Sequence, residues 1–132
     1  MINIKAEIKG ETDMSPFIKM FEFSDNDEII FLNSVDTIKQ KLSKNMRLNM
    51  NETLTMYLAY VVSQIRSKNS VENIVNNVSK ILTADNVMIG VPETLRKITF
   101  NAIIDDQPKT QITFNEPIPS SNYILSTENV RN

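Results

Sequence analysis

Neither histidine nor cysteine occurs anywhere in this sequence of 132 residues. Histidine is the side chain that most often transfers protons near neutral pH and most often binds transition metals. A self-contained nickel or zinc hydrolase is therefore not expected. The lack of cysteine excludes a disulfide framework, thiolate metal sites and thiol nucleophiles. The composition predicts a chain without a catalytic, metal or cofactor site of its own.

An excess of charge of one sign and a long apolar run are also missing. The 14 Lys and Arg residues nearly balance the 16 Asp and Glu residues, which gives a formal net charge of -2. Nucleic-acid binding usually requires a basic patch, so we expect no nucleic-acid partner. No apolar run approaches the roughly 18 residues of a membrane span, and no secretory signal pattern marks the N-terminus. We therefore expect a cytoplasmic protein with no membrane contact.

The N-terminal region contains two segments with strand character. Residues 2–9 place an apolar side chain at every second position, which is the period of a half-buried strand. Residues 17–23 favour a second strand that returns along the first. Two arrangements stay open for the first strand. It joins this domain's own C-terminal hairpin, or it extends the sheet edge of a neighbouring chain.

Four helices are predicted from capping signals that precede helical spacing of apolar residues. Ser24, Ser70 and Thr83 stand at candidate N-caps, and Asn49 with Glu52 has the spacing of a capping box. The helix after Asn49 is apolar on more than one face, which is typical of a helix at the centre of a bundle or beneath a partner. The acids that follow Ser24 could suggest a cation site, but the helix dipole explains them more simply.

A β-hairpin is predicted after the helices. Residues 97–104 and 110–114 alternate in apolar character around the cluster Asp105–Asp106–Gln107–Pro108. Turn chemistry explains the two aspartates better than a carboxylate pair for acid-base catalysis, because no motif nearby supplies a base or an oxyanion donor.

The combined pattern predicts an α+β fold: a compact four-helix domain followed by a C-terminal β-hairpin, with an additional N-terminal β segment. The expected division is an N-terminal β extension over residues 1–22, a domain over residues 23–118 and a polar tail over residues 119–132.

Residues 82–93 are the most informative stretch: Leu-Thr-Ala-Asp-Asn-Val-Met-Ile-Gly-Val-Pro-Glu. A short helix is expected here, with Gly90 left-handed after its last turn and Pro92 preventing continuation. Asp85 is expected in the first turn, where backbone N–H groups and the dipole stabilise a carboxylate. Glu93 is expected to be exposed, as a plausible partner contact.

The methionines offer two interpretations, core filling or an adaptable binding surface. Core filling is expected for Met56 and Met88, which fall within predicted helices. Met46 and Met50 fall in a connecting segment, where they could contribute to an interface.

Residues 82–93 resemble a signature of the urease gamma subunit family, which runs L-T-x-D-x-V-M-x-G-V-P-E, and every specified position is met. Leu48, Asn49 and Glu52 meet the family's L-N-x-x-E, and residues 114–118 echo the N-P-I that follows its hairpin. The chain departs from the family at Val78–Ser79–Lys80, where G-R-H is usual, and in the missing histidine before the N-P-I.

The resemblance implies a non-catalytic structural subunit of urease, the nickel enzyme that hydrolyses urea to ammonia and carbamate. Nickel is then expected on a separate large subunit, and the partners are the large and beta-type subunits in a threefold hetero-oligomer. The alternative is a paralogue that kept the gamma fold and acts outside urease as a self-associating or partner-binding module. The candidate signature or subunit-interface residues are Asn49, Glu52, Asp85, Met88, Gly90, Val91, Pro92, Glu93 and Pro117.

Overall fold

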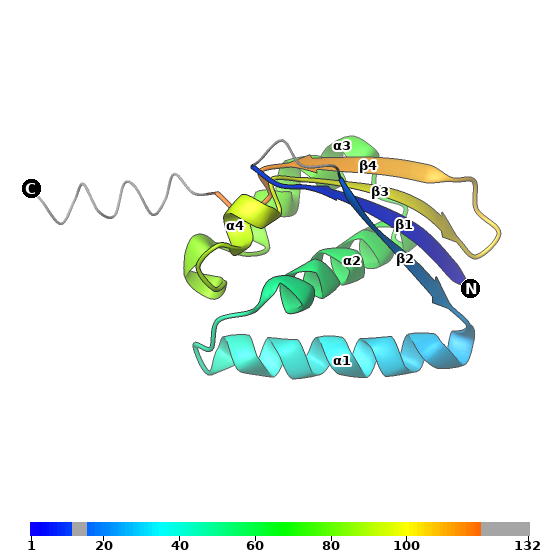
Figure 1. The fold of residues 1–132 in the computed structure, drawn as a ribbon. Helices are drawn as coiled ribbons and strands as arrows, with labels where there is room; N and C mark the ends of the chain where they lie inside the picture. Colours follow the sequence, from blue (N-terminus) through cyan, green and yellow to red (C-terminus); the bar gives the residue numbers. More distant parts are fainter. Residues whose placement is uncertain (12–15, 120–132) are drawn as a thin grey trace, which may run out of the picture.

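A computed structural model of the chain describes residues 1–11 and 16–119. Figure 1 shows the sheet above the two longest helices. The elements in chain order are β1 (Ile2–Lys9), β2 (Phe17–Phe23), α1 (Asp25–Ser43), α2 (Met50–Arg66), α3 (Val71–Asn77), α4 (Val91–Thr94), β3 (Lys97–Ile104) and β4 (Thr110–Asn115). Two 3-10 turns, Val78–Lys80 and Ala84–Asn86, lie between α3 and α4.

All four strands belong to one antiparallel sheet with the order β2-β1-β3-β4. Ile4 on β1 faces Phe21 on β2 and Ala102 on β3. The strand over residues 2–9 therefore joins this domain's own hairpin, which was the first of the two arrangements left open. Its apolar alternation matches that of β3, so pairing in this register buries both apolar rows on one face.

The α+β prediction is confirmed, but the expected compact four-helix domain differs in detail from the structure. Among the helices of the described residues, α1 and α2 are long, whereas α3 has seven residues and α4 has four. The sheet packs on the helices as one layer. The reason lies in the N-terminal strands, which pair with the hairpin and make it part of a broader sheet.

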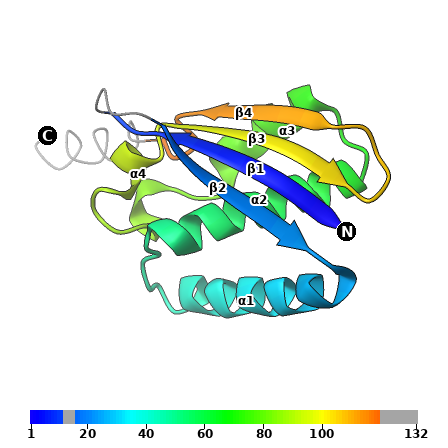
Figure 2. The same cartoon turned by 45° about the vertical axis from the view of Figure 1, so that its right-hand side comes forward.

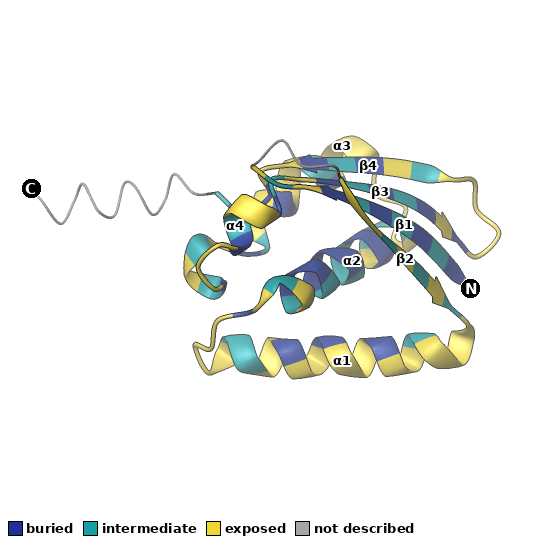
Figure 3. Cartoon of the chain, in the orientation of Figure 1, coloured by how far each residue is buried: buried dark blue, intermediate teal, exposed yellow. Residues whose placement is uncertain are grey.

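Helix α2 lies between the sheet and α1, as both views of the ribbon show (Figures 1 and 2). This position explains its apolar character on more than one face, because the sheet covers one side and α1 the other. Figure 3 shows that α2 is largely buried, whereas α1 shows a narrow buried stripe. The buried residues of α2 are Thr53, Leu54, Met56, Tyr57, Leu58, Val61 and Val62.

The predicted N-caps at Ser24, Asn49 and Ser70 are confirmed. The Asp27 amide donates to Ser24 Oγ at 3.3 Å, and the Asn73 amide donates to Ser70 Oγ at 3.2 Å. At α2 the capping box is reciprocal: the Glu52 amide donates to Asn49 Oδ1 at 2.8 Å, and the Asn49 amide donates to Glu52 Oε1 at 3.0 Å. Such bonds satisfy amide groups that the first turn of a helix leaves without partners.

The acids that follow Ser24 serve as a cap and as ion-pair partners. Asp27 completes the capping box of α1. The α-ammonium group of Met1 lies 3.2 Å from Asp25 and 3.1 Å from Asp105. Glu28 pairs with Arg66. These pairs connect the starts of β1 and α1 with the end of α2 and the β3–β4 turn.

Candidate partner interface

The signature over residues 82–93 forms a surface loop that backbone hydrogen bonds hold in place. The Leu48 amide donates to the Asn86 carbonyl at 2.9 Å, and the Met88 amide donates to the Leu48 carbonyl at 2.9 Å. These bonds form an isolated parallel bridge between Leu48 and Val87. Both residues are almost completely buried. The signature is thereby fixed to the segment that leads into α2.

Apolar anchors hold both ends of this loop in the core. Leu82, at the start of the loop, has 1 % of its surface exposed, and Leu95, just after its end, is fully buried. Between them, Asn86 accepts a hydrogen bond from the Thr83 amide at 2.8 Å. Asp85 lies in this 3-10 turn, but the side chain that bonds back to the cap residue is that of Asn86.

Gly90 has the expected left-handed conformation, with φ of 94°. Its predicted place after the last turn of a helix is wrong, because it is the N-cap of α4 and Pro92 lies in the first turn of that helix. Proline suits a first turn, where its missing N–H is not needed. No atom lies within 4 Å of a Cβ built on Gly90. The backbone angle, rather than a lack of space, is what favours glycine here.

The expectation that Met88 fills the core is also wrong. Its side chain is 47 % exposed, and the neighbouring Ile89 is 97 % exposed. Val87 has an extended backbone and occupies the buried position beside Leu48. Since successive side chains of an extended segment point in opposite directions, Met88 turns outward. The loop thus presents two apolar side chains to solvent at adjacent positions.

A hollow of about 520 Å³ lies against this loop. Its lining includes Met88, Ile89 and Pro92 together with Arg47 and Arg96. Arg96 Nη1 lies 2.8 Å from Glu116 Oε1, and Arg96 also pairs with Glu11. The lining therefore combines apolar side chains with charges of both signs, as many protein–protein interfaces do.

The structure brings most of the predicted site residues to this region. Asp85 and Glu93 are exposed and line the hollow, whereas Val91, the first residue of α4, is buried. Asn49 and Glu52 cap α2 directly after Leu48, so their first role is structural. Pro117 is buried and follows Glu116, the partner of Arg96.

Arg47, Arg96 and Ile89 were not singled out from the sequence. For Ile89 a signal was present, since it is an apolar residue between a methionine and a left-handed glycine in a surface turn. The two arginines gave none, because only the folded chain brings them to one surface. Of the other methionines, Met56 is buried as expected, and Met46 is 49 % exposed.

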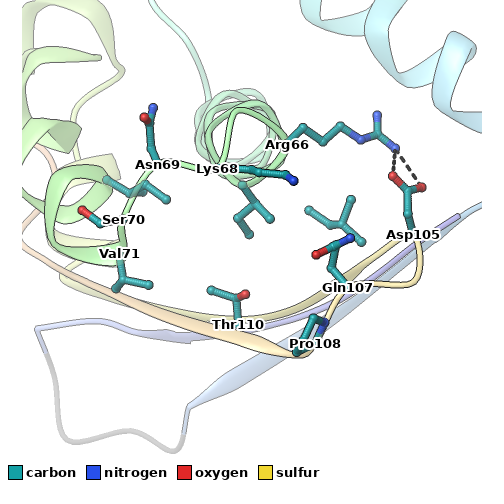
Figure 4. A pocket seen from close by; sticks show the side chains of 12 residues that line it. Arg66, Lys68, Asn69, Ser70, Val71, Asp105, Gln107, Pro108 and Thr110 are labelled. Carbon is teal, nitrogen blue, oxygen red and sulfur yellow. Dashed lines mark hydrogen bonds and ion pairs between the residues drawn. The ribbon is translucent and has the colours of Figure 1, made fainter.

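A second hollow, of about 530 Å³, lies between the end of α2, the start of α3 and the β3–β4 turn. Figure 4 shows Arg66 at its rim, reaching Asp105. The hydrogen bond from the N-terminal ammonium group and the charge of Arg66 lower the pKa of Asp105. A carboxylate with a lowered pKa is a weak base, and Asp105 has the positive φ of 55° of a turn residue. This geometry favours the turn interpretation of the two aspartates.

Within residues 1–11 and 16–119, no group of three or more Asp or Glu side chains is arranged to hold a metal ion. In the same part of the chain, no helix is long and apolar enough to cross a membrane.

Comparisons with known proteins give a consistent result. The family model described as urease, gamma subunit, matches residues 20–118. The urease subunit gamma of Halalkalibacterium halodurans is 32 % identical over 80 residues, which are 61 % of this chain and 79 % of that relative. The urease subunit gamma of Prochlorococcus marinus is 26 % identical over 94 residues, which are 71 % of this chain and 93 % of that relative. The family match begins inside β2, so β1 lies outside it.

Proposed function

Since this chain belongs to the urease gamma subunit family, we propose that it is the non-catalytic gamma-type subunit of a urease. Its partners are a large subunit that holds the nickel and hydrolyses urea to ammonia and carbamate, and a beta-type subunit. The three kinds of chain assemble around a threefold axis. This chain supports catalysis by stabilising the assembly and holding the surface of the large subunit in place.

The observation that carries the proposal is the form of the signature loop. A loop with buried ends, backbone hydrogen bonds to Leu48 and a left-handed Gly90 is rigid, yet it exposes Met88 and Ile89. A side chain that is 97 % exposed gains little from its own fold. Apolar residues in such positions contribute to stability when a partner covers them. A preorganised loop also loses little conformational entropy on binding.

The side chains present on this chain also support a non-catalytic role. Histidine and cysteine are missing from the full sequence. Near the signature, Arg96 pairs with Glu11 and Glu116. The other charged side chains that line the hollow are exposed: Arg47, Asp85 and Glu93. These groups suit the rim of an interface. They supply no nucleophile with an adjacent base.

The test is co-expression of this chain with the large and beta-type chains of the same source in nickel-containing medium. A tag on this chain is used for purification, followed by mass spectrometry, nickel determination and an assay of ammonia release from urea. We expect a stoichiometric, nickel-bearing, active complex. Recovery of this chain without a nickel-bearing large chain would contradict the proposal.

A matched pair of variants locates the contact. Ile89→Lys changes the exposed tip of the signature loop, whereas Ile103→Lys changes an exposed isoleucine on the outer face of β3. Both substitutions replace an exposed side chain and should leave folding intact, as far-UV circular dichroism can verify. We expect Ile89→Lys to abolish co-purification and Ile103→Lys to preserve it. Normal assembly of Ile89→Lys would exclude the signature loop as the contact without excluding the urease assignment.

The alternative function is an interaction module outside urease. The observation that favours it is the N-terminal β1 and the start of β2, which lie outside the matched region. Under this alternative, purification from the native source yields this chain with unrelated partners and no nickel.

A further inference from the structure

Strand β2 forms one of the two edges of the sheet. Its seven residues pair with β1 on one side. Within the described residues no strand pairs with its other side, because the sheet ends there in the order β2-β1-β3-β4. An edge strand presents unpaired backbone N–H and C=O groups that can accept another strand.

The two edges of this sheet differ in character. On β4, the outer-face residues Gln111, Thr113 and Asn115 are polar. On β2, the outer face carries Ile18, which is 52 % exposed, and Met20, which is 62 % exposed. Proteins usually protect an edge with charges, proline or a bulge. The β4 edge is polar as expected, and the β2 edge is not.

The charged residues of β2 do not block its outer face near the centre. Lys19 points toward the helices, where its Nζ donates to Asn51 Oδ1 at 3.0 Å. Glu22 lies on the outer face but near the end of the strand. Phe17 is 40 % exposed although it lies on the inner face. The edge is therefore apolar on both faces at the start of β2.

We propose that β2 pairs antiparallel with β2 of a second copy of this chain, which joins two four-stranded sheets into one. A twofold axis perpendicular to the sheet places the inner faces of both sheets on the same side. Two residues that pair across the axis must therefore both belong to the inner face or both to the outer face. With Met20 on the axis, all seven residues of the strand are paired. Lys19 then faces Phe21 of the other copy, and Ile18 faces Glu22.

Neighbouring registers are less favourable. A shift that places Lys19 on the axis sets two lysines directly opposite each other, which is destabilising. A shift that places Phe21 on the axis leaves Phe17 and Ile18 without strand partners. The register centred on Met20 avoids opposing like charges and gives each exposed apolar residue of β2 a partner on the other strand. This complementarity of the strand with itself is the reason for choosing a second copy over another partner.

The pairing goes beyond the proposed function and is tested on this chain alone. A contact of one strand per copy is small, and small interfaces bind weakly, so dissociation constants on the order of micromolar are expected. Sedimentation velocity at up to about 100 µM, well above that range, should show a concentration-dependent dimer of the wild type. A monomer at all concentrations would overturn the proposal.

Residue 20 permits a charge-swap experiment because it lies on the axis. Met20→Lys sets two lysines face to face, and Met20→Glu sets two glutamates face to face, so each variant alone should be monomeric. An equimolar mixture should restore the dimer. The control Ile103→Lys adds a charge to the same outer face two strands away and should dimerise normally. A dimer of Met20→Lys equal to that of the wild type, or a mixture that stays monomeric, would overturn the pairing.

The absence of cysteine provides a second, independent test. Met20→Cys introduces a single thiol, and residues directly opposite in an antiparallel pair have Cα atoms about 4.5 to 5.5 Å apart, within disulfide range. Mild oxidation should give a covalent dimer for Met20→Cys and none for Ile103→Cys. Equal cross-linking of the two variants would mean random collision and would contradict the register.

Discussion

Tyr57 provides the sharpest test of the packing. It lies on α2 between the helix and the sheet and is fully buried, with its ring centroid 6.1 Å from that of Phe114. Within the described residues its hydroxyl oxygen has no hydrogen-bond partner. Burial raises the pKa of this phenol far above its usual range. The hydroxyl therefore stays neutral, and no group within the described residues replaces the hydrogen bonds that it makes to water in the unfolded chain.

The substitution Tyr57→Phe removes the hydroxyl and keeps the ring. A buried polar group without a partner costs about 1–3 kcal/mol. We expect the free energy of unfolding to increase by about 1 kcal/mol, because small rearrangements recover part of the cost. For a domain of this size, such a gain raises the Tm by roughly 3–6 °C.

Tyr60→Phe is the matched control, because both tyrosines lie on α2 and both rings contact Phe114, with centroids 6.1 Å away. The Tyr60 hydroxyl donates to the Ile74 carbonyl at 2.7 Å. Its removal breaks one hydrogen bond and should lower the free energy of unfolding by about 1 kcal/mol. The same chemical change is thus predicted to have opposite signs at two neighbouring positions.

Urea unfolding followed by far-UV circular dichroism measures both effects, since the chain has no tryptophan for fluorescence. Midpoints can be compared directly if the slope of each transition is unchanged. If Tyr57→Phe destabilises the protein as much as Tyr60→Phe does, the Tyr57 hydroxyl has a partner in solution. The account of this core would then be wrong.

Two further predictions concern the α1–α2 pair and the signature loop. The hydrogen bond from Lys41 at 2.6 Å, assisted by the Asn49 amide, lowers the pKa of Glu52 below its ordinary value of 4.5. A lowered pKa contributes stability that is present above pH 4.5 and is lost as the pH falls through the folded-state pKa. Glu52→Gln should therefore flatten the acid limb of the unfolding free energy measured against pH, and an unchanged acid limb would contradict this role. Gly90→Ala should cost about 1 kcal/mol in urea unfolding because a side chain is strained at positive φ, and a neutral result would mean that the loop adopts another conformation.

The sequence by itself determined the elements that depend on contacts a few residues apart. The cap at Ser24 bonds to an amide three residues on, and the Asn49–Glu52 box has the same span. The alternation of β1 and β3 likewise predicted which face of each strand is buried. Such patterns require only the geometry of a helix turn or of a pleated strand, so they can be recognised before the fold is known.

Tertiary structure alone decided the features that depend on contacts between distant segments. Pairing of Ile2 with Ile104 placed β1 inside the sheet, although the isolated pattern suited a neighbour's edge equally well. The bridge between Leu48 and Val87 turned Met88 outward, against the expectation from its helical spacing. The two tyrosines of α2 look alike in the sequence, and only the position of α3 gives Tyr60 a hydrogen-bond acceptor. Tertiary packing decides which buried polar groups find hydrogen-bond partners and which side of a loop is covered. The local periodicity of the sequence does not encode this packing.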